Sequence, residues 1–131
     1  MPFDWREFLI IAHELRNQTS EGAQRTCLGR AYYYVYNLGL GKATRLGFTK
    51  NPNSPVHKQL WDWCQKQTDP DIKQMGVTGN RMKVSRVDAD YYDSIPNLAA
   101  KVKLQLERAQ EFETLVAKSN GQPPPPRLDS P

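Results

Sequence analysis

The sequence predicts an all-α fold, an antiparallel four- to five-helix bundle. Three observations support this prediction: apolar residues recur every three or four positions in five segments, capping residues precede several of these segments, and no segment alternates as a strand does. Short connections between helices with apolar faces favour antiparallel packing. We therefore expect a helical domain over residues 1–119, followed by a disordered, proline-rich tail over residues 120–131.

The first two helices are predicted in the N-terminal third of the chain. The first covers about residues 4–17, where Asp4 and Glu7 have the spacing of a capping box. The second begins near Ser20 and is long. Glycines weaken its far end, so we expect this helix to fray or kink between residues 38 and 47.

The remaining three helices have clear start signals. Ser54 is suited to the N-cap and the following proline to the first helical position of the third helix. Asp69 and its proline repeat this pattern for the fourth helix, which Gly76 and Gly79 are expected to divide into two pieces. The last helix is predicted over about residues 94–118.

The composition excludes several classes of protein. Hydrophobic residues make up 38% and charged residues 24% of the chain, which is typical of a folded domain. The two cysteines and the lack of a signal pattern favour the cytoplasm. The longest apolar run near the N-terminus, residues 8–12, is too short to cross a bilayer. Cys27 and Cys64 show no metal-ligand spacing with either histidine, so we expect no metal and no cofactor.

Positive charge is concentrated in the middle of the chain. The net charge is +4, but residues 42–86 hold nine Lys and Arg against three Asp, which leaves +6 there. Such a stretch raises the local concentration of an anionic polymer such as RNA. The alternative is a solvated helical face without a ligand.

Two segments carry polar side chains that could bind a ligand or take part in a reaction. Arg30, Tyr33 and Asn37 are spaced three and four apart, so they share one stripe of a helix. A guanidinium keeps its charge and must meet a carboxylate, carbonyl groups or a bound anion. Arg86 and Asp90 lie one helical turn apart. If the two helices pack together, Arg30 can bridge to Asp90, which leaves Arg86 for a phosphate or a second carboxylate; the alternative is a purely structural polar network.

The aromatic residues divide by their helical spacing. Tyr34 and Trp63 fall on apolar stripes and are predicted to lie in the core. Tyr32, Tyr36 and Trp61 fall off the main stripes and are expected at a surface or interface, where aromatic rings can stack on bases.

The run Arg30-Ala31-Tyr32-Tyr33, followed in a later helix by Arg86-x-x-Ala89-Asp90-Tyr91, resembles the HEPN superfamily. More narrowly, it resembles the small HEPN proteins encoded next to minimal nucleotidyltransferases. The resemblance covers roughly residues 4–118. It implies a HEPN-like bundle of four or five helices, homodimerisation, a partner such as a nucleotidyltransferase or a defence-complex subunit, and a role in a toxin-antitoxin or defence module.

The resemblance also bears on activity, because many HEPN proteins cleave RNA without a metal. Active members carry an arginine followed, after about four to six residues, by a histidine that acts in acid–base chemistry. Here Arg86 is followed at that place by Tyr91, and tyrosine, with a pKa near 10, is a poor base at pH 7. If the protein cleaves RNA, we expect Arg86 to neutralise the phosphate and Tyr91 or His57 to assist proton transfer.

The residues predicted to bind RNA or a nucleotide are polar side chains of the two segments and their surroundings: Arg30, Tyr33, Asn37, Arg81, Lys83 and Asp90. Two rival functions are an RNA-binding accessory subunit without nuclease activity and a non-catalytic helical adaptor or dimerisation subunit of a larger complex. Arg6 and His13 also match the spacing of the nuclease motif, but they lie in the first helix and are interpreted as a chance match. For His57, the alternative to a catalytic role is a structural one, as a hydrogen-bonded histidine near a helix start.

Overall fold

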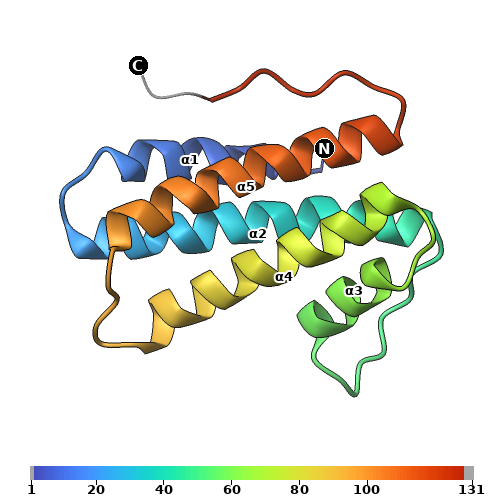
Figure 1. Ribbon diagram of the computed structural model, residues 1–131, viewed down its shortest axis with the longest axis horizontal. Helices are drawn as coiled ribbons and strands as arrows, with labels where there is room; N and C mark the ends of the chain where they lie inside the picture. The colour runs from blue at the N-terminus through green and yellow to red at the C-terminus, as the bar shows by residue number, and fades with distance from the viewer. Residues whose placement is uncertain (1, 129–131) are drawn as a thin grey trace.

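The computed structural model describes residues 2–128 and contains five α-helices in that range (Figure 1). They are α1 (Arg6–Arg16), α2 (Glu21–Arg45), α3 (Val56–Gln65), α4 (Pro70–Tyr91) and α5 (Leu98–Ser119). The described residues include no strand, so the predicted all-α class is confirmed. None of the helices in this range is long and apolar enough to cross a membrane.

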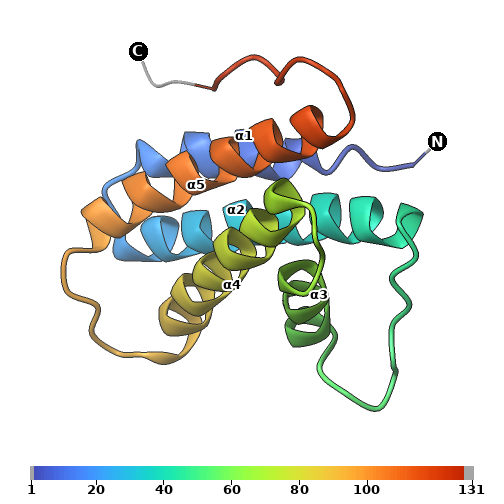
Figure 2. The same cartoon turned by 45° about the vertical axis from the view of Figure 1, so that its right-hand side comes forward.

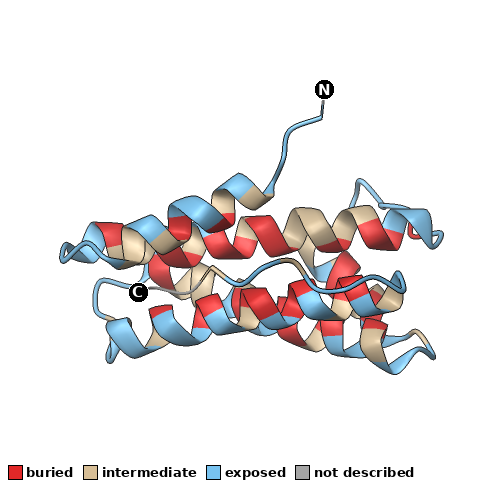
Figure 3. Ribbon diagram, turned by 90° about the horizontal axis from the view of Figure 1, so that it is seen from above, coloured by how far each residue is buried: buried red, intermediate tan, exposed pale blue. Residues whose placement is uncertain are grey.

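Helix α2 is the centre of the bundle, because it contacts each of the other four helices. Figure 1 shows α1, α2, α4 and α5 running lengthwise, and in that order each of these four helices points in the opposite direction to the one before it. The short α3 lies beside α4 and packs mainly against it, as Figure 2 also shows. Figure 3 shows the buried residues on the sides of the helices that face one another.

Side chains cap the starts of two helices, α2 and α4. The Ser20 hydroxyl accepts a hydrogen bond from the backbone N–H of Ala23 at 3.1 Å. The Asp69 carboxylate accepts from a backbone N–H in the first turn of α4 at 2.8 Å. The predicted capping box at Asp4 and Glu7 is wrong: Asp4 accepts from the backbone N–H of Arg6 at 3.0 Å, but Trp5 occupies the N-cap position of α1 and no side chain caps this helix.

The predicted N-cap at Ser54 is wrong. Pro55 directly precedes α3, and no side-chain hydrogen bond caps this helix. The carbonyl of Ser54 instead accepts from the side-chain amide of Gln59 at 2.8 Å. The amide of Gln59 thereby fastens the preceding loop to the helix, and the start of α3 moves one residue later than the sequence predicts.

Helix α2 does not break where its glycines predict a break. It continues to Arg45, because Gly39 faces the core and brings α2 close to Trp61 and Phe112, whose ring atoms lie 3.0 Å from the position that a Cβ would take. The helix ends at Leu46, and Gly47 follows with a φ of 107°. This left-handed conformation suits glycine and ends many helices.

Helix α4 is also continuous, so the predicted division at its glycines is wrong. Both glycines face α3. A Cβ at Gly79 would lie 2.5 Å from the Trp61 ring, and a Cβ at Gly76 would lie 2.7 Å from the Trp61 carbonyl oxygen. The two glycines therefore let α3 and α4 approach closely, and tertiary packing outweighs their low helix propensity.

The aromatic core differs from the sequence prediction. Tyr34 is buried as predicted, but Tyr32 and Trp61 are fully buried as well, and Trp63 is only partly buried. The indole of Trp61 fills the space that Gly39 and Gly79 leave open. Helical spacing does not predict this arrangement, because spacing describes each helix alone, whereas glycines of two neighbouring helices together make the space for the Trp61 indole.

The residues after α5 run back along the bundle in an extended conformation (Figures 1 and 3). Nη2 of Arg6 donates to the carbonyl of Pro126 at 2.5 Å, and the backbone N–H of Leu128 donates to the Gln110 side chain at 3.2 Å. Leu128 is partly buried against the core. Residues 122–128 form no helix or strand, the predicted disordered tail stays a prediction, and residues 129–131 lie outside the described residues.

Candidate functional site

The two predicted segments meet at a pocket of about 230 Å³ between α2 and α4. Its lining is dominated by arginines and small or aromatic side chains: Arg25, Thr26, Gly29, Arg30, Tyr33, Arg86 and Asp90. Three guanidinium groups thus share the pocket with one carboxylate. We call it the arginine pocket. Its excess of positive charge favours an anionic ligand.

Arg86 is the most buried charge of the arginine pocket, since only 15% of its side chain is exposed. Its Nη1 donates to the Asp90 carboxylate at 3.1 Å. Its guanidinium also lies over the rings of Tyr32 and Tyr33, 5.6 and 5.4 Å from their centroids. The Nε of Arg86 is buried and has no hydrogen-bond partner within residues 2–128. A buried charged donor of this kind is stabilised by an acceptor from a ligand or from water.

Arg25 closes one end of the arginine pocket. Its guanidinium donates to the carbonyls of Ala89 at 2.9 Å, Tyr92 at 2.5 Å and Asp93 at 3.0 Å. These carbonyls lie at the end of α4, so the positive charge meets the negative end of the helix dipole. The sequence analysis missed Arg25. The signal was present, because Arg25 lies two helical turns before Tyr33 on the same side of α2.

Arg30 lies at the open edge of the arginine pocket and is exposed. Its guanidinium carbon lies 4.8 Å from the centroid of the Phe8 ring in α1. The predicted bridge from Arg30 to Asp90 does not form, because Asp90 pairs with Arg86 on its own helix. Within the described chain Arg30 has no ion pair, so its charge is available to a ligand.

His57 lies next to this pocket without lining it. Its Nδ1 lies 2.6 Å from the hydroxyl oxygen of Tyr32, and its ring stacks on Tyr36 with 3.8 Å between centroids. Burial, followed by the positive charges of Arg86 and Lys83, lowers the pKa of His57 to about 4. His57 is therefore neutral at pH 7.

The hydrogen bonds around Tyr32 fix the form of the neutral imidazole. The indole N–H of Trp61 donates to the Tyr32 hydroxyl oxygen at 3.1 Å. Burial raises the pKa of Tyr32, so the hydroxyl keeps its proton and donates it to Nδ1 of His57. The ring proton of His57 then resides on Nε2.

The other predicted site residues are spread more widely. Tyr91 is 75% exposed and is not part of the arginine pocket. The side-chain amide of Asn37 donates to the backbone carbonyl of Tyr33 at 2.8 Å, a bond within its own helix. Lys83 lies close enough to lower the pKa of His57. Arg81 is exposed. Burial of Arg108 in α5 lowers the pKa of Arg108, and the positive charge of Arg81 lowers it further.

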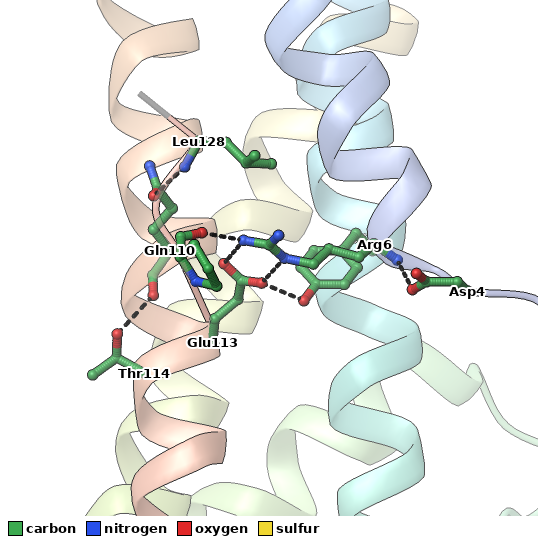
Figure 4. Close-up of polar contacts among 8 residues, drawn as sticks. Asp4, Arg6, Gln110, Glu113, Thr114 and Leu128 are labelled. Atoms are coloured by element: carbon green, nitrogen blue, oxygen red, sulfur yellow. Dashed lines mark hydrogen bonds and ion pairs between the residues drawn. The ribbon is translucent and has the colours of Figure 1, made fainter. Parts of the chain in front are cut away.

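A second polar cluster connects α1, α2 and α5 (Figure 4). Nε of Arg6 donates to the Glu113 carboxylate at 2.7 Å, and the Tyr34 hydroxyl donates to the same carboxylate at 2.6 Å. Glu113 is buried, and both its oxygens meet Arg6. Burial and the bond to Glu113 raise the pKa of Tyr34. Arg6 therefore belongs to an internal ion pair, consistent with its interpretation as a chance match to the nuclease motif.

The chain matches no protein-family model, no curated protein and no solved structure. Among residues 2–128, no three His, Cys, Asp or Glu side chains come together as ligands for a metal ion. The arginine pocket and its neighbours are thus the part of the molecule on which a functional proposal rests.

Proposed function

We propose that this protein is a HEPN-type RNA-binding protein that holds a backbone phosphate of RNA in the arginine pocket. One observation carries the proposal: three arginines and a single aspartate line one pocket, and the buried Nε of Arg86 has no acceptor within the described chain. Phosphate oxygens are good partners for guanidinium groups, because the planar fork of guanidinium N–H donors can bind two oxygens of the oppositely charged phosphate at once.

Each of the three arginines has a different role in the proposed binding of a phosphate. Arg25 holds the end of α4 and so keeps the arginine pocket in shape. Arg86 lies at the floor, already oriented by Asp90 and by two tyrosine rings. Arg30 stands at the exposed edge and meets the anion first. A ligand group therefore finds one fixed and one adaptable cation, which lowers the ordering cost of binding.

RNA cleavage without a metal is the second candidate, favoured by the position of Arg86 close to His57. Two features make it weaker than binding. The pKa of His57 is about 4, so its basicity is low at neutral pH, and its Nδ1 is already engaged by Tyr32. Tyr91 is exposed outside the pocket. The geometry therefore supports a binding protein better than a nuclease.

The family resemblance extends this proposal beyond the single chain. A HEPN protein of this kind would act in the cytoplasm as a homodimer, within a toxin-antitoxin or defence module. Its partner would be a nucleotidyltransferase or another subunit of a defence complex. In the rival adaptor function, the same arginines serve only internal bonds, as Arg25 does.

Fluorescence anisotropy with a labelled single-stranded RNA tests the proposal. Arg30→Ala removes an exposed cation of the arginine pocket, and Arg45→Ala removes an exposed cation near the far end of the same helix. We expect Arg30→Ala to weaken RNA binding by about tenfold, because charge-assisted hydrogen bonds contribute on this scale. Arg45→Ala should change it by less than about twofold. Equal losses in both variants, or no binding by the unmodified protein, would contradict the proposal.

The nuclease candidate has its own test with the same RNA. Incubation with excess EDTA separates a metal-independent reaction from a contaminating metal-dependent nuclease. Cleavage that survives EDTA and disappears in His57→Ala and Arg86→Ala would establish the second candidate. RNA that stays intact while it binds supports the accessory or adaptor class instead.

A further inference from the structure

Three aromatic rings gather at the start of the chain, two of them exposed and the third, Phe8, partly buried against the core. Phe3, Trp5 and Phe8 pack edge to face, with centroids 5.0 Å apart for Phe3 and Trp5, 5.3 Å for Trp5 and Phe8, and 5.7 Å for Phe3 and Phe8. Phe3 is 49% and Trp5 40% exposed. Among residues 2–128 no other phenylalanine or tryptophan is this accessible. We call these three residues the aromatic cluster.

The aromatic cluster is continuous with the arginine pocket. The guanidinium of Arg30 lies 4.8 Å from the Phe8 centroid, and Arg30 also lines the pocket. One cation is thus shared by a ring of the cluster on one side and the phosphate site on the other. Phe3 and Trp5 pack on Phe8, the ring that Arg30 contacts, so the exposed rings are linked to the arginine pocket through Phe8.

We infer that the aromatic cluster is a stacking platform for unpaired bases of a single-stranded RNA whose backbone phosphate occupies the arginine pocket. This inference rests on the proposed function and names the form of RNA that the site takes. Exposed rings next to a cation are the combination that holds single strands, since every base offers a π-face and every nucleotide a phosphate. A duplex hides its bases inside the stack and presents only its backbone and groove edges.

Charge and exposure both favour this occupant. A surface of ring faces alone would suit any apolar partner, but Arg30 and the pocket behind it add positive charge at one edge. RNA supplies the matching alternation of flat apolar bases and negative phosphates. A second copy that docked through the same surface would bring its own arginines toward Arg30, so like charges would oppose that two-fold contact.

Trp5→Ala is the variant that isolates the platform. Trp5 is 40% exposed and precedes α1 without a side-chain capping bond, so its removal leaves the capping of the helix unchanged. Ile10→Ala is the matched control, because Ile10 is also 40% exposed and stands two residues from Phe8, on a different side of the helix. Far-UV circular dichroism establishes that both variants keep the native helix content.

Anisotropy with three probes completes the experiment: a labelled single-stranded RNA, a labelled RNA duplex of equal length, and inorganic pyrophosphate as a competitor. We expect Trp5→Ala to weaken single-strand binding by about tenfold and to leave duplex binding and pyrophosphate competition unchanged. Trp5→Phe, which keeps a ring, should recover most of the affinity. Arg30→Ala should weaken all three interactions.

The other outcomes separate the two proposals. If Arg30→Ala weakens binding while Trp5→Ala and Ile10→Ala both leave single-strand affinity unchanged, the platform is overturned and the proposed function stands. If the unmodified protein binds none of the three probes, both are overturned. If Trp5→Ala converts a dimer to a monomer in light scattering and duplex binding falls equally, the aromatic cluster is a subunit interface, which also overturns the platform.

Discussion

The indole N–H of Trp61 donates a hydrogen bond to the hydroxyl oxygen of Tyr32, and this bond determines what Tyr32 can offer to His57. Because its oxygen already accepts from Trp61, the Tyr32 hydroxyl directs its own proton to Nδ1 of the imidazole. The ring lies between Tyr32 and the stacked Tyr36, where burial, followed by the charges of Arg86 and Lys83, lowers the pKa of His57 and keeps the ring neutral. Arg86 lies over the Tyr32 ring, so the same tyrosine joins the histidine to the arginine pocket.

Folding stability should depend on the protonation of His57. Its pKa falls from the usual 6.5 to about 4 in the folded protein, so the unfolded chain binds more protons between these values. The contribution of neutral His57 is therefore complete above pH 6.5 and is lost as the pH falls toward 4. In urea unfolding from pH 4 to 7.5, we expect the stability difference between the native protein and His57→Asn to shrink at the acid end. A difference that does not vary with pH would contradict this.

The site shows which features a sequence can predict and which it cannot. The spacing of Arg30 and Tyr33 and that of Arg86 and Asp90 predicted two polar stripes, and the fold brings both to one pocket. The partners within that pocket were only partly predictable: the one-turn spacing favours Arg86 as the partner of Asp90, whereas a bridge from Arg30 depends on how the two helices pack. Arg86 is chosen since it lies one turn away on the same helix.

The packing around Trp61 also could not be predicted from single helices. The glycines of α2 and α4 predicted breaks, because helix propensity considers each helix by itself. In the folded protein, Gly39 and Gly79 lie on two helices that surround one indole. A glycine in a helix is ambiguous in sequence: it weakens the helix, or it makes room for a neighbour. The two cases can be told apart only when the neighbouring side chain is known, and a single sequence does not show which side chain packs against a given glycine.

Gly79→Ala should therefore destabilise the protein. The added Cβ would lie 2.5 Å from the Trp61 ring, and a fully buried indole has no free space to move into. We expect a loss of about 2 kcal/mol in the free energy of unfolding, measured with urea. Gly22→Ala is the control, because nothing lies within 4 Å of its Cβ position, and it should be neutral or stabilising by about 0.5 kcal/mol. Equal effects of both substitutions would show that α3 does not pack closely against α4.

The ion pair between Arg6 and Glu113 should contribute to stability far more than a surface pair. Glu113→Gln keeps the shape of the side chain but removes the charge that Arg6 and the Tyr34 hydroxyl both meet. We expect a loss of about 2 kcal/mol, below the range for fully buried pairs because 22% of the Arg6 side chain is exposed to water. The matched substitution at the exposed Glu111 of the same helix should change stability by less than about 0.5 kcal/mol. Urea unfolding of both variants measures the difference.

The proline-rich tail should stabilise the bundle that it follows. Truncation after Gln122 removes the carbonyl of Pro126 from Arg6 and the partly buried Leu128 from the core. The lost hydrogen bonds and apolar contact predict a decrease of about 1 kcal/mol in the free energy of unfolding. Leu128→Ala in the full chain should account for part of this loss. A truncated protein as stable as the full chain would show that these contacts are not maintained in solution.

The shape of the Arg86 guanidinium, and not its charge alone, should determine RNA affinity. Arg86→Lys keeps one positive charge but removes the Nε donor and the flat surface that lies over Tyr32 and Tyr33. We therefore expect Arg86→Lys to weaken RNA binding nearly as much as Arg86→Ala, by about tenfold. Titrations at several salt concentrations separate the two contributions: Arg86→Lys should keep the salt dependence of the native protein, whereas Arg86→Ala should reduce its slope by about one ion. If Arg86→Lys binds RNA as tightly as the native protein, only a positive charge is needed at this position, and the proposed role of the buried Nε is wrong.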